Sequence, residues 1–205
     1  MNYTTLAPTD TVTKTVNALK ERNFNAFRVQ TKTEAIEKIR ELIPAGASVM
    51  NGSSETLREI GLIDVLKSKD HPWNNLHDAV LAEPDPEKKA KLRNESVLSE
   101  YYLGSVHALT EKGEIVIASN TGSQMPHIVY TSPNLVFVVG THKIVPDLES
   151  ALVRIEEHVI PLEDERMKKV YGFGTTYAKT LILRRENPNF GRTITVIFVD
   201  EVLGY

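Results

Sequence analysis

The stretch from residue 47 to residue 60 has residue types suited to holding an anion. Its apolar start, Ala47-Ser48-Val49-Met50, predicts a buried strand, and residues 55–60 predict a short helix. Where a strand leads into a helix, unpaired backbone N–H groups and the helix dipole favour a phosphate or carboxylate. The candidate binding residues here are Asn51, Gly52, Ser53, Ser54 and Thr56. The alternative is an ordinary helix N-cap, in which a serine only satisfies the first turn.

Two further polar loops follow predicted strands. The loop after Ala118 offers Asn120, Thr121, Gly122 and Ser123 as ligand donors, and its alternative is a plain turn. The loop after Val139 carries His142 and Lys143. Lys143 would neutralise an anion held by the other loops, and His142 is a candidate for proton transfer because histidine titrates near physiological pH. Glu114 is a further candidate catalytic residue, and a solvated loop is the alternative for residues 140–143.

Strands alternate with helices along most of the chain, which predicts an α/β fold: one domain with a mixed sheet flanked by helices. The expected strands are 24–29, 47–50, 106–110, 115–118, 134–140, 180–184 and 193–199. The expected helices are 10–19, 35–43, 55–60, 87–103, 147–159 and 163–170. Strand 134–140 is nearly continuously apolar, which predicts cover on both faces. We expect strands 106–110 and 115–118 to form a hairpin, strand 180–184 to pair with 193–199, and Pro161 to end a helix. The charged residues of 163–169 indicate a solvated helix face.

Composition excludes several classes of site. The 205 residues include no cysteine, so this chain can form no disulfide, no thiolate zinc site and no cysteine-ligated iron–sulfur cluster. The six histidines show no metal-ligand spacing on a helix, so we expect no metal site. A formal net charge of −3 gives no general attraction to nucleic acid or to anionic membranes. With neither a signal peptide nor a membrane segment visible, the expected location is the cytoplasm.

Three stretches together resemble the LUD-domain family of lactate-utilisation proteins. They are Asn51–Gly61, His107–Gly122 and Val138–Ala151, and the ending Glu201-Val202-Leu203-Gly204-Tyr205 is similar to the short single-domain members. The resemblance spans residues 10–205. It implies one LUD-like domain over 1–205, with residues 1–30 as an appended helix and strand, and a fold similar to the sugar-phosphate isomerase and CoA-transferase-like superfamily.

The resemblance implies a part in the oxidation of lactate or other 2-hydroxy acids to the oxo acid. The expected role is an accessory subunit that binds a small anionic metabolite at the strand-end loops, beside partner subunits bearing iron–sulfur clusters. Because this chain has no cysteine, electrons would pass through such a partner or an added cofactor. A homo-oligomer is compatible with the sequence.

Two alternatives stay open. The first is a stand-alone isomerase-type enzyme acting on a sugar phosphate or acid, with His142, Glu114 or Glu201 as general base. The second is a non-catalytic regulatory or assembly module. The resemblance also implies that CoA-transferase relatives use a glutamate nucleophile in a loop similar to 119–122. That loop holds no glutamate in this chain, so covalent CoA transfer is disfavoured.

Overall fold

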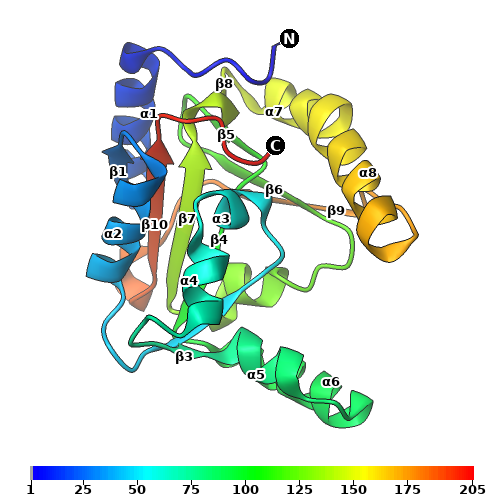
Figure 1. The fold of residues 1–205 in the computed structure, drawn as a ribbon. Helices are drawn as coiled ribbons and strands as arrows, with labels where there is room; N and C mark the ends of the chain where they lie inside the picture. The colour runs from blue at the N-terminus through cyan, green and yellow to red at the C-terminus, as the bar shows by residue number, and fades with distance from the viewer. Residues whose placement is uncertain (1) are drawn as a thin grey trace.

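Strand β7 (Asn134–Gly140) lies at the centre of the molecule. The computed structural model, which describes residues 2–205, places it in a six-stranded parallel main sheet of order β1-β10-β7-β4-β2-β3 (Figure 1). The other strands of this sheet are β1 (Asn25–Val29), β2 (Ser48–Asn51), β3 (Asn74–Asn75), β4 (Tyr101–Gly104) and β10 (Thr193–Val199). The predicted α/β architecture is therefore observed, with β1 at one edge of the sheet.

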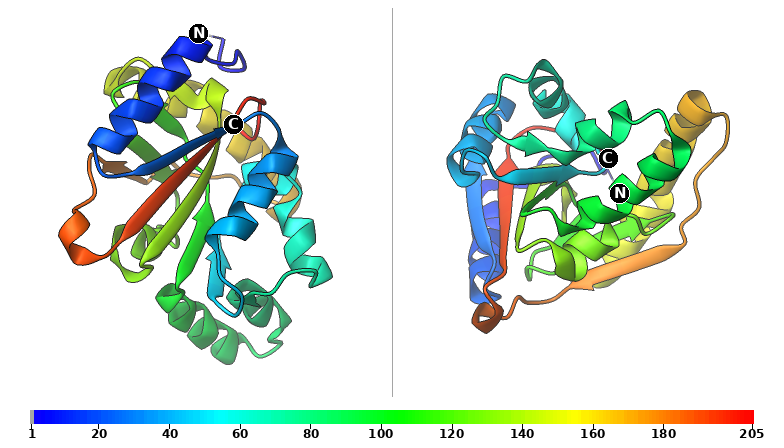
Figure 2. Two further views of the ribbon diagram at one scale, coloured as in Figure 1. Left: turned by 90° about the vertical axis from the view of Figure 1, so that its left-hand side faces the viewer. Right: turned by 90° about the horizontal axis from the view of Figure 1, so that it is seen from below.

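The side chains of β7 point alternately into two apolar clusters. Leu135, Phe137 and Val139 join the cluster that includes α1, whereas Val136 and Val138 join the cluster of α2, α3 and α4. These helices are α1 (Thr9–Glu21), α2 (Lys32–Leu42), α3 (Glu55–Glu59) and α4 (Leu62–Ser68). Figure 2 shows α1 and α2 on opposite sides of the β1–β10 edge. Cover on both faces of this strand is confirmed, and each such buried side chain contributes about 1.5–3 kcal/mol.

A second, four-stranded sheet packs on the α1 side of the main sheet. Its order is β8-β5-β6-β9, and it mixes parallel with antiparallel pairs. Its strands are β5 (Ala108–Thr110), β6 (Ile115–Ser119), β8 (Ile144–Val145) and β9 (Lys179–Leu183). Leu109, Ile115 and Ile117 reach the same cluster as α1. The predicted hairpin is confirmed, because β5 and β6 pair antiparallel.

One long helical rod covers the outer face of this second sheet. It comprises α7 (Leu148–Arg154), a π-helical turn (Ile155–Val159) and α8 (Ile160–Tyr171). Asp147 caps its start by accepting a hydrogen bond from the Ser150 N–H. The prediction that Pro161 ends a helix is wrong. The Ile160 N–H already bonds five residues back to the Ile155 carbonyl, so the proline enters at the first turn of α8, where a missing N–H is tolerated.

The predicted helix 87–103 ends much earlier than expected. Helix α6 covers Pro86–Glu95, a 3-10 turn follows, and β4 then lies between β2 and β7. Tyr102, Leu103 and Gly104 of this strand are buried. A four-residue strand with three consecutive buried positions has no period-two alternation, so its sequence does not distinguish it from the end of a helix.

The predicted pairing of 180–184 with 193–199 is also wrong. β9 pairs antiparallel with β6 in the second sheet, while β10 lies between β1 and β7 in the main sheet. Positions Ile194–Val199 are all buried, so β10 needs neighbours on both edges and cover on both faces. The turn between these strands therefore crosses from one sheet to the other.

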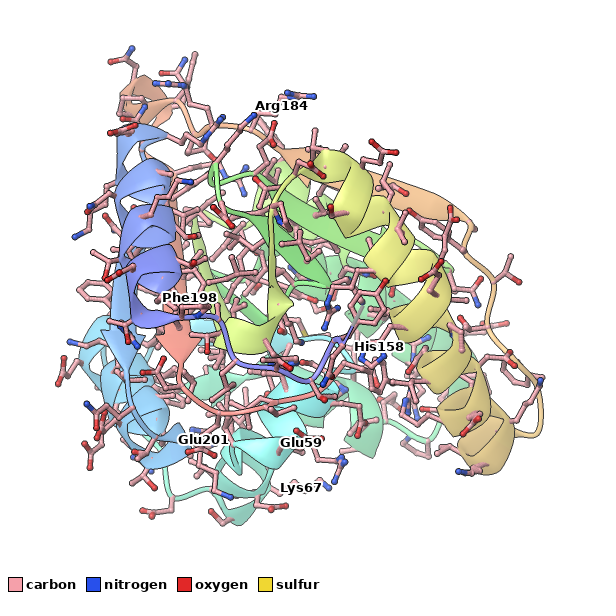
Figure 3. The ribbon with its side chains drawn as sticks, turned by 90° about the horizontal axis from the view of Figure 1, so that it is seen from above. Glu59, Lys67, His158, Arg184, Phe198 and Glu201 are labelled. Atoms are coloured by element: carbon pink, nitrogen blue, oxygen red, sulfur yellow. The ribbon has the colours of Figure 1, made fainter. Side chains whose placement is uncertain are left out.

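Two helical arms and the N-terminal segment complete the fold. Helices α5 (Leu76–Ala82) and α6 form one arm beyond β3, and α8 forms another (Figure 2). Residues before α1 run toward the π-helical turn, where the Tyr3 ring lies 5.1 Å from that of His158 (Figure 3). Within residues 2–205, no helix combines the length and the apolar character needed to cross a membrane.

Candidate functional site

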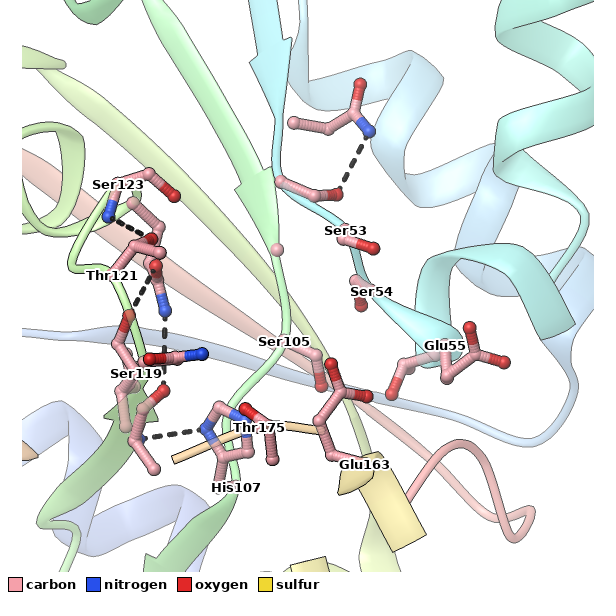
Figure 4. Close-up of a pocket in the computed structure, with 18 of the residues that line it drawn as sticks. Ser53, Ser54, Glu55, Ser105, His107, Ser119, Thr121, Ser123, Glu163 and Thr175 are labelled. Atoms are coloured by element: carbon pink, nitrogen blue, oxygen red, sulfur yellow. Dashed lines mark hydrogen bonds between the residues drawn. The ribbon is translucent and has the colours of Figure 1, made fainter. Parts of the chain in front are cut away.

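A cavity of about 740 Å³ opens where β2 and β4 end, between the second sheet and α8 (Figure 4). Its volume falls in the range of small-molecule sites. The loop after β2 and the loop after β6 lie on two sides of it, and residues of α3 and α8 complete its lining (Figure 4). The segment Ser105–His107, which follows β4, lies between the two loops. The cavity therefore lies at the carboxyl ends of parallel strands, where α/β sheets usually bind ligands.

Lys143 is a deeply buried cationic residue that lines this cavity. It lies on the 3-10 turn Thr141–Lys143 directly after β7, and it is 2% exposed. Its Nζ donates to Thr56 Oγ1 at 2.9 Å and to Ser105 Oγ at 3.3 Å. Among residues 2–205, no carboxylate oxygen lies within 4.0 Å of this nitrogen. Lys143 is thus buried beside hydroxyl groups instead of a counter-charge.

This environment lowers the pKa of Lys143 to about 7. Burial is the main cause and the charge of Arg154 adds to it, while Glu59 acts in the opposite direction. Arg154 is itself fully buried, and its Nη1 donates to the His107 backbone carbonyl. At neutral pH, Lys143 therefore populates both the ammonium and the amine form.

The polar side chains of the loop after β2 and the start of α3 have different hydrogen-bond partners. The Ser54 hydroxyl caps α3 by accepting from the Leu57 N–H at 3.3 Å, so the N-cap interpretation holds for this residue. Thr56 donates its hydroxyl proton to the Leu203 carbonyl at 3.2 Å, which leaves its lone pairs for Lys143. Asn51 donates to the Gly52 carbonyl at 3.2 Å. Ser53 lies on the cavity wall (Figure 4).

Gly52 is required by a close approach. A Cβ atom at this position would lie 2.6 Å from the hydroxyl oxygen of Tyr102. Tyr102 is buried, and burial raises the pKa of its hydroxyl, although the Gly52 backbone N–H opposes this by hydrogen bonding. The tyrosine therefore stays a neutral phenol next to the loop.

His107 supplies a neutral donor. Its Nδ1 accepts a hydrogen bond from the Ala118 backbone N–H at 3.0 Å, which assigns the ring proton to Nε2. Burial, together with the charges of Lys143 and Arg154, lowers the pKa of His107 to about 3. The ring lines the cavity close to Ser105 (Figure 4). His107 is thus suited to donate a hydrogen bond but not to accept a proton.

Glu163 of α8 also lines the cavity, where it has several hydrogen-bond partners. Its carboxylate accepts from Arg166 Nε and Nη2, each at 2.7 Å, and from the Tyr205 hydroxyl. Arg166 Nε also lies 3.8 Å from Glu55 Oε1. Burial raises the pKa of Glu163, but these hydrogen bonds outweigh it, so the net pKa is lowered. The expected solvated helix face is thus only part of α8, because Glu163 and Arg166 line the cavity.

The loop after β6 is largely closed on itself. The Ser119 hydroxyl donates to Gln124 Oε1 and accepts from the Gly122 N–H, both at 2.9 Å. Thr121 Oγ1 accepts from the Ser123 N–H. Asn120, Thr121 and Ser123 line the cavity, whereas Gly122 packs against Lys179 instead. These bonds fit the plain-turn interpretation, with three polar residues left on the cavity wall.

The structure does not bring His142 and Glu114 to the cavity. The His142 ring packs beneath Gly140 and the Glu201 backbone, and burial lowers its pKa to about 3. Glu114 lies at the other end of β6, where its carboxylate accepts from Arg184 at 3.0 Å. Glu201 accepts from the Lys32 backbone N–H at 2.8 Å and does not line the cavity either, so of the four candidate catalytic residues only Lys143 lines it. Residues 2–205 hold no cluster of three or more potential metal ligands.

Comparison with known proteins adds the family. The model of the LUD domain matches residues 12–199. The chain belongs to the LUD-domain family. Among solved structures, this LUD-domain chain is similar to a DUF162 family protein from Deinococcus radiodurans, with 10% sequence identity and a TM-score of 0.58 over 95% of this chain and 99% of that one. That likeness confirms the fold class.

A weaker similarity links this LUD-domain chain to eIF2B beta from Chaetomium thermophilum. The identity is 14% and the TM-score 0.38, over 59% of this chain and 45% of that one. A search of curated proteins finds no match.

The site residues that the sequence did not reveal are Ser105, His107, Glu163, Arg166 and Tyr205. Two of them, Ser105 and His107, come directly after β4. The strand-end argument that singled out the loops after β2, β6 and β7 would have included them if β4 had been recognised as a strand.

Proposed function

We propose that this LUD-domain protein binds a small anionic metabolite, a carboxylate or phosphate, in the cavity, with Lys143 as its counter-charge. The observation that carries the proposal is the burial of the Lys143 nitrogen beside two hydroxyl oxygens with no carboxylate partner. Burial of an ammonium here costs desolvation free energy that no ion pair offsets, and a bound anion would supply that ion pair.

The other polar groups of the cavity restrict which ligands fit. Among residues 2–205 the Lys143 nitrogen has no carboxylate partner and attracts an anionic group, whereas the charges of Glu163 and Arg166 already pair with each other. A ligand hydroxyl would donate to the Glu163 carboxylate, and His107 Nε2–H would donate to a ligand oxygen. A 2-hydroxy acid or a sugar phosphate has both an anionic group and hydroxyl groups.

The family resemblance supports a role for this ligand binding in lactate or 2-hydroxy-acid utilisation. In that setting the chain would act as an accessory subunit in the cytoplasm. Oxidation would need a partner bearing an iron–sulfur cluster, or an added cofactor, since this chain has no cysteine. The proposal for this chain itself is ligand binding.

Calorimetric titration tests the binding proposal. The purified chain is titrated with lactate, pyruvate, ribose 5-phosphate and inorganic phosphate near neutral pH. At least one should bind, and Lys143→Met should weaken that binding about 10-fold or more, because a charge-assisted contact contributes at least ~1.5 kcal/mol. Lys91→Met is the matched control, since Lys91 is an exposed lysine paired with Glu95 on α6. Unchanged affinity in Lys143→Met would remove Lys143 from the site.

A second candidate function is acid–base catalysis on a sugar phosphate or acid. Glu163 favours it, because this carboxylate lines the same cavity as Lys143. Its lowered pKa keeps it ionised at neutral pH, as a general base requires, but also makes it a weak base. Turnover of a panel of sugar phosphates by the lone protein, abolished in Glu163→Gln, would establish this activity.

A further inference from the structure

We propose that Lys143 acts as a nucleophile and forms a reversible imine with the carbonyl group of a 2-oxo acid bound in the cavity. The proposal rests on the proposed function for the presence of an anionic ligand at this place. It goes beyond that function by assigning a covalent step to one atom, Lys143 Nζ, and by naming the ligand class.

The position of the nitrogen suits attack on a carbonyl carbon. Thr56 Oγ1 and Ser105 Oγ take up two of its hydrogens, at 2.9 and 3.3 Å. The Thr56 hydroxyl proton is engaged by the Leu203 carbonyl, so Thr56 acts toward Lys143 only as an acceptor. Gly204 packs beside the nitrogen, where a Cβ would lie 3.3 Å from it. An amine that donates two hydrogens to these hydroxyl groups keeps its lone pair outside both contacts.

The charges around Lys143 favour the amine form that attack requires. Arg154 from α7 disfavours the ammonium, and Glu59 of α3 favours it to a smaller extent. His107 is neutral, and Glu163 is engaged by Arg166 and Tyr205. Desolvation of a lysine in this manner is how enzymes activate amine nucleophiles at neutral pH.

The step balances without an oxidant or reductant. The nitrogen lone pair forms a C–N bond to the carbonyl carbon, and a proton passes from nitrogen to the carbonyl oxygen to give a carbinolamine. The C–O bond then breaks, and the oxygen leaves as water with a second proton from the nitrogen. The product is the C=N bond of an imine. His107 Nε2–H is placed to donate a hydrogen bond to the departing oxygen.

The ligand class follows from charge. Once the imine nitrogen takes up a proton from solvent water, it carries the positive charge that the Lys143 ammonium would otherwise supply. In a 2-oxo acid the carboxylate is bonded directly to the imine carbon, so the covalent complex keeps an anion beside a cation in a buried place. A simple aldehyde or ketone would lack this compensation.

Borohydride trapping tests the proposal on the full chain. Pyruvate is the probe, and borohydride reduces an imine to a stable secondary amine. Intact mass should show one reduced pyruvate per chain, and peptide mapping should place it on Lys143. Lactate, which has no carbonyl group, should give no adduct. Trapping should increase as the pH rises through about 7, where Lys143 loses its proton.

Lys143→Arg separates this proposal from the proposed function. Arginine keeps a cation for the anion but forms no imine under these conditions, so binding by calorimetry should persist while the adduct falls to background. Lys91→Met should trap as the wild type does. If Lys143→Arg does not fold by circular dichroism, the peptide map of the wild type decides alone.

An adduct spread over surface lysines, or none at Lys143, overturns the imine. Pyruvate binding without an adduct would leave the proposed function standing. Absence of binding by every tested anion would overturn both.

Discussion

Burial of Lys143 lowers the stability of the folded chain and at the same time prepares this residue to bind an anion. A buried ammonium without a carboxylate partner destabilises the folded chain, and burial accordingly lowers its pKa to about 7. The same cost makes the site attractive to an anion, since a ligand would supply the interaction that the protein does not. Groups placed at such a cost are frequent at functional sites.

The pH dependence of stability should report this cost. The pKa of Lys143 is about 7 in the folded chain, below its ordinary value of 10.5. Between these values the unfolded chain binds one more proton at this residue, so Lys143 makes the free energy of unfolding rise with pH across that window. Lys143→Met should lack this contribution, and Lys91→Met should retain it. Urea unfolding from about pH 7 to about pH 10 measures it, and equal slopes in all three proteins would contradict the burial of the charge.

Gly52 gives a second residue-level prediction. In Gly52→Ala the new Cβ would meet the Tyr102 hydroxyl at 2.6 Å, so the variant should lose about 1–3 kcal/mol of unfolding free energy. The next atom of that ring, Cζ, is 3.8 Å away, which is an ordinary contact.

Tyr102→Phe removes only the oxygen and should rescue the alanine variant. The double variant should therefore have a higher free energy of unfolding than the summed effects of the two single variants predict, as denaturant unfolding would show. Strict additivity would mean that the hydroxyl is not what excludes a side chain at position 52.

At the level of elements, α3 and α8 meet at the cavity through charged side chains. Thr56 of α3 accepts from the Lys143 nitrogen, while Arg166 of α8 pairs with Glu163 of its own helix and lies 3.8 Å from Glu55 of α3. Within residues 2–205 the Glu163 carboxylate thus has a cationic partner and the Lys143 nitrogen has no carboxylate partner, so an anionic ligand is attracted to Lys143.

Removal of the Glu163 charge should strengthen the binding of a simple anion. In Glu163→Gln one negative charge disappears and Arg166 loses its main partner, so inorganic phosphate should bind about 3-fold to 10-fold more tightly. Glu165→Gln is the matched control on the same helix, because Glu165 is exposed and pairs only weakly with Lys169. Calorimetry measures both, and weaker phosphate binding in Glu163→Gln would place the anion elsewhere.

The strands that the sequence predicted well are those with a strong local signal. β7 is long and apolar throughout, and the β5–β6 hairpin has a clear turn. The sequence does not predict β4, because this strand is short and follows a helical stretch. Ser105 and His107, which follow it, are therefore not predicted as site residues. The partner of β10 was misassigned because sheet order depends on tertiary packing, which adjacency in the sequence does not specify.

The candidate site was predictable to a similar extent. The loop after β2 and Lys143 were found because each follows an apolar strand. Glu163 and Arg166 lie in a charged helical run, and its local pattern does not distinguish the cavity side from the solvent side. His142 looked equivalent to Lys143 in sequence, yet adjacent residues on a tight turn point in different directions, and His142 packs under Gly140.

At the level of the whole molecule, the cavity exists because two sheets diverge. β4 ends in the main sheet, and the chain then enters β5 of the second sheet through Gly104–His107. The rod of α7 and α8 covers the second sheet and extends past it to form the far wall (Figure 1). Lys143 lies at the corresponding crossing from β7 to β8. The site is therefore built from two of the crossings between the sheets, from β4 to β5 and from β7 to β8.

A crystal structure of the full chain grown with phosphate or lactate tests the central claim most directly. We predict density for the anion within hydrogen-bond distance of Lys143 Nζ, with His107 Nε2 as a further donor. Density confined to the loop 119–124 or to the protein surface, with the Lys143 nitrogen bonded only to Thr56 and Ser105, would contradict the assignment of the site.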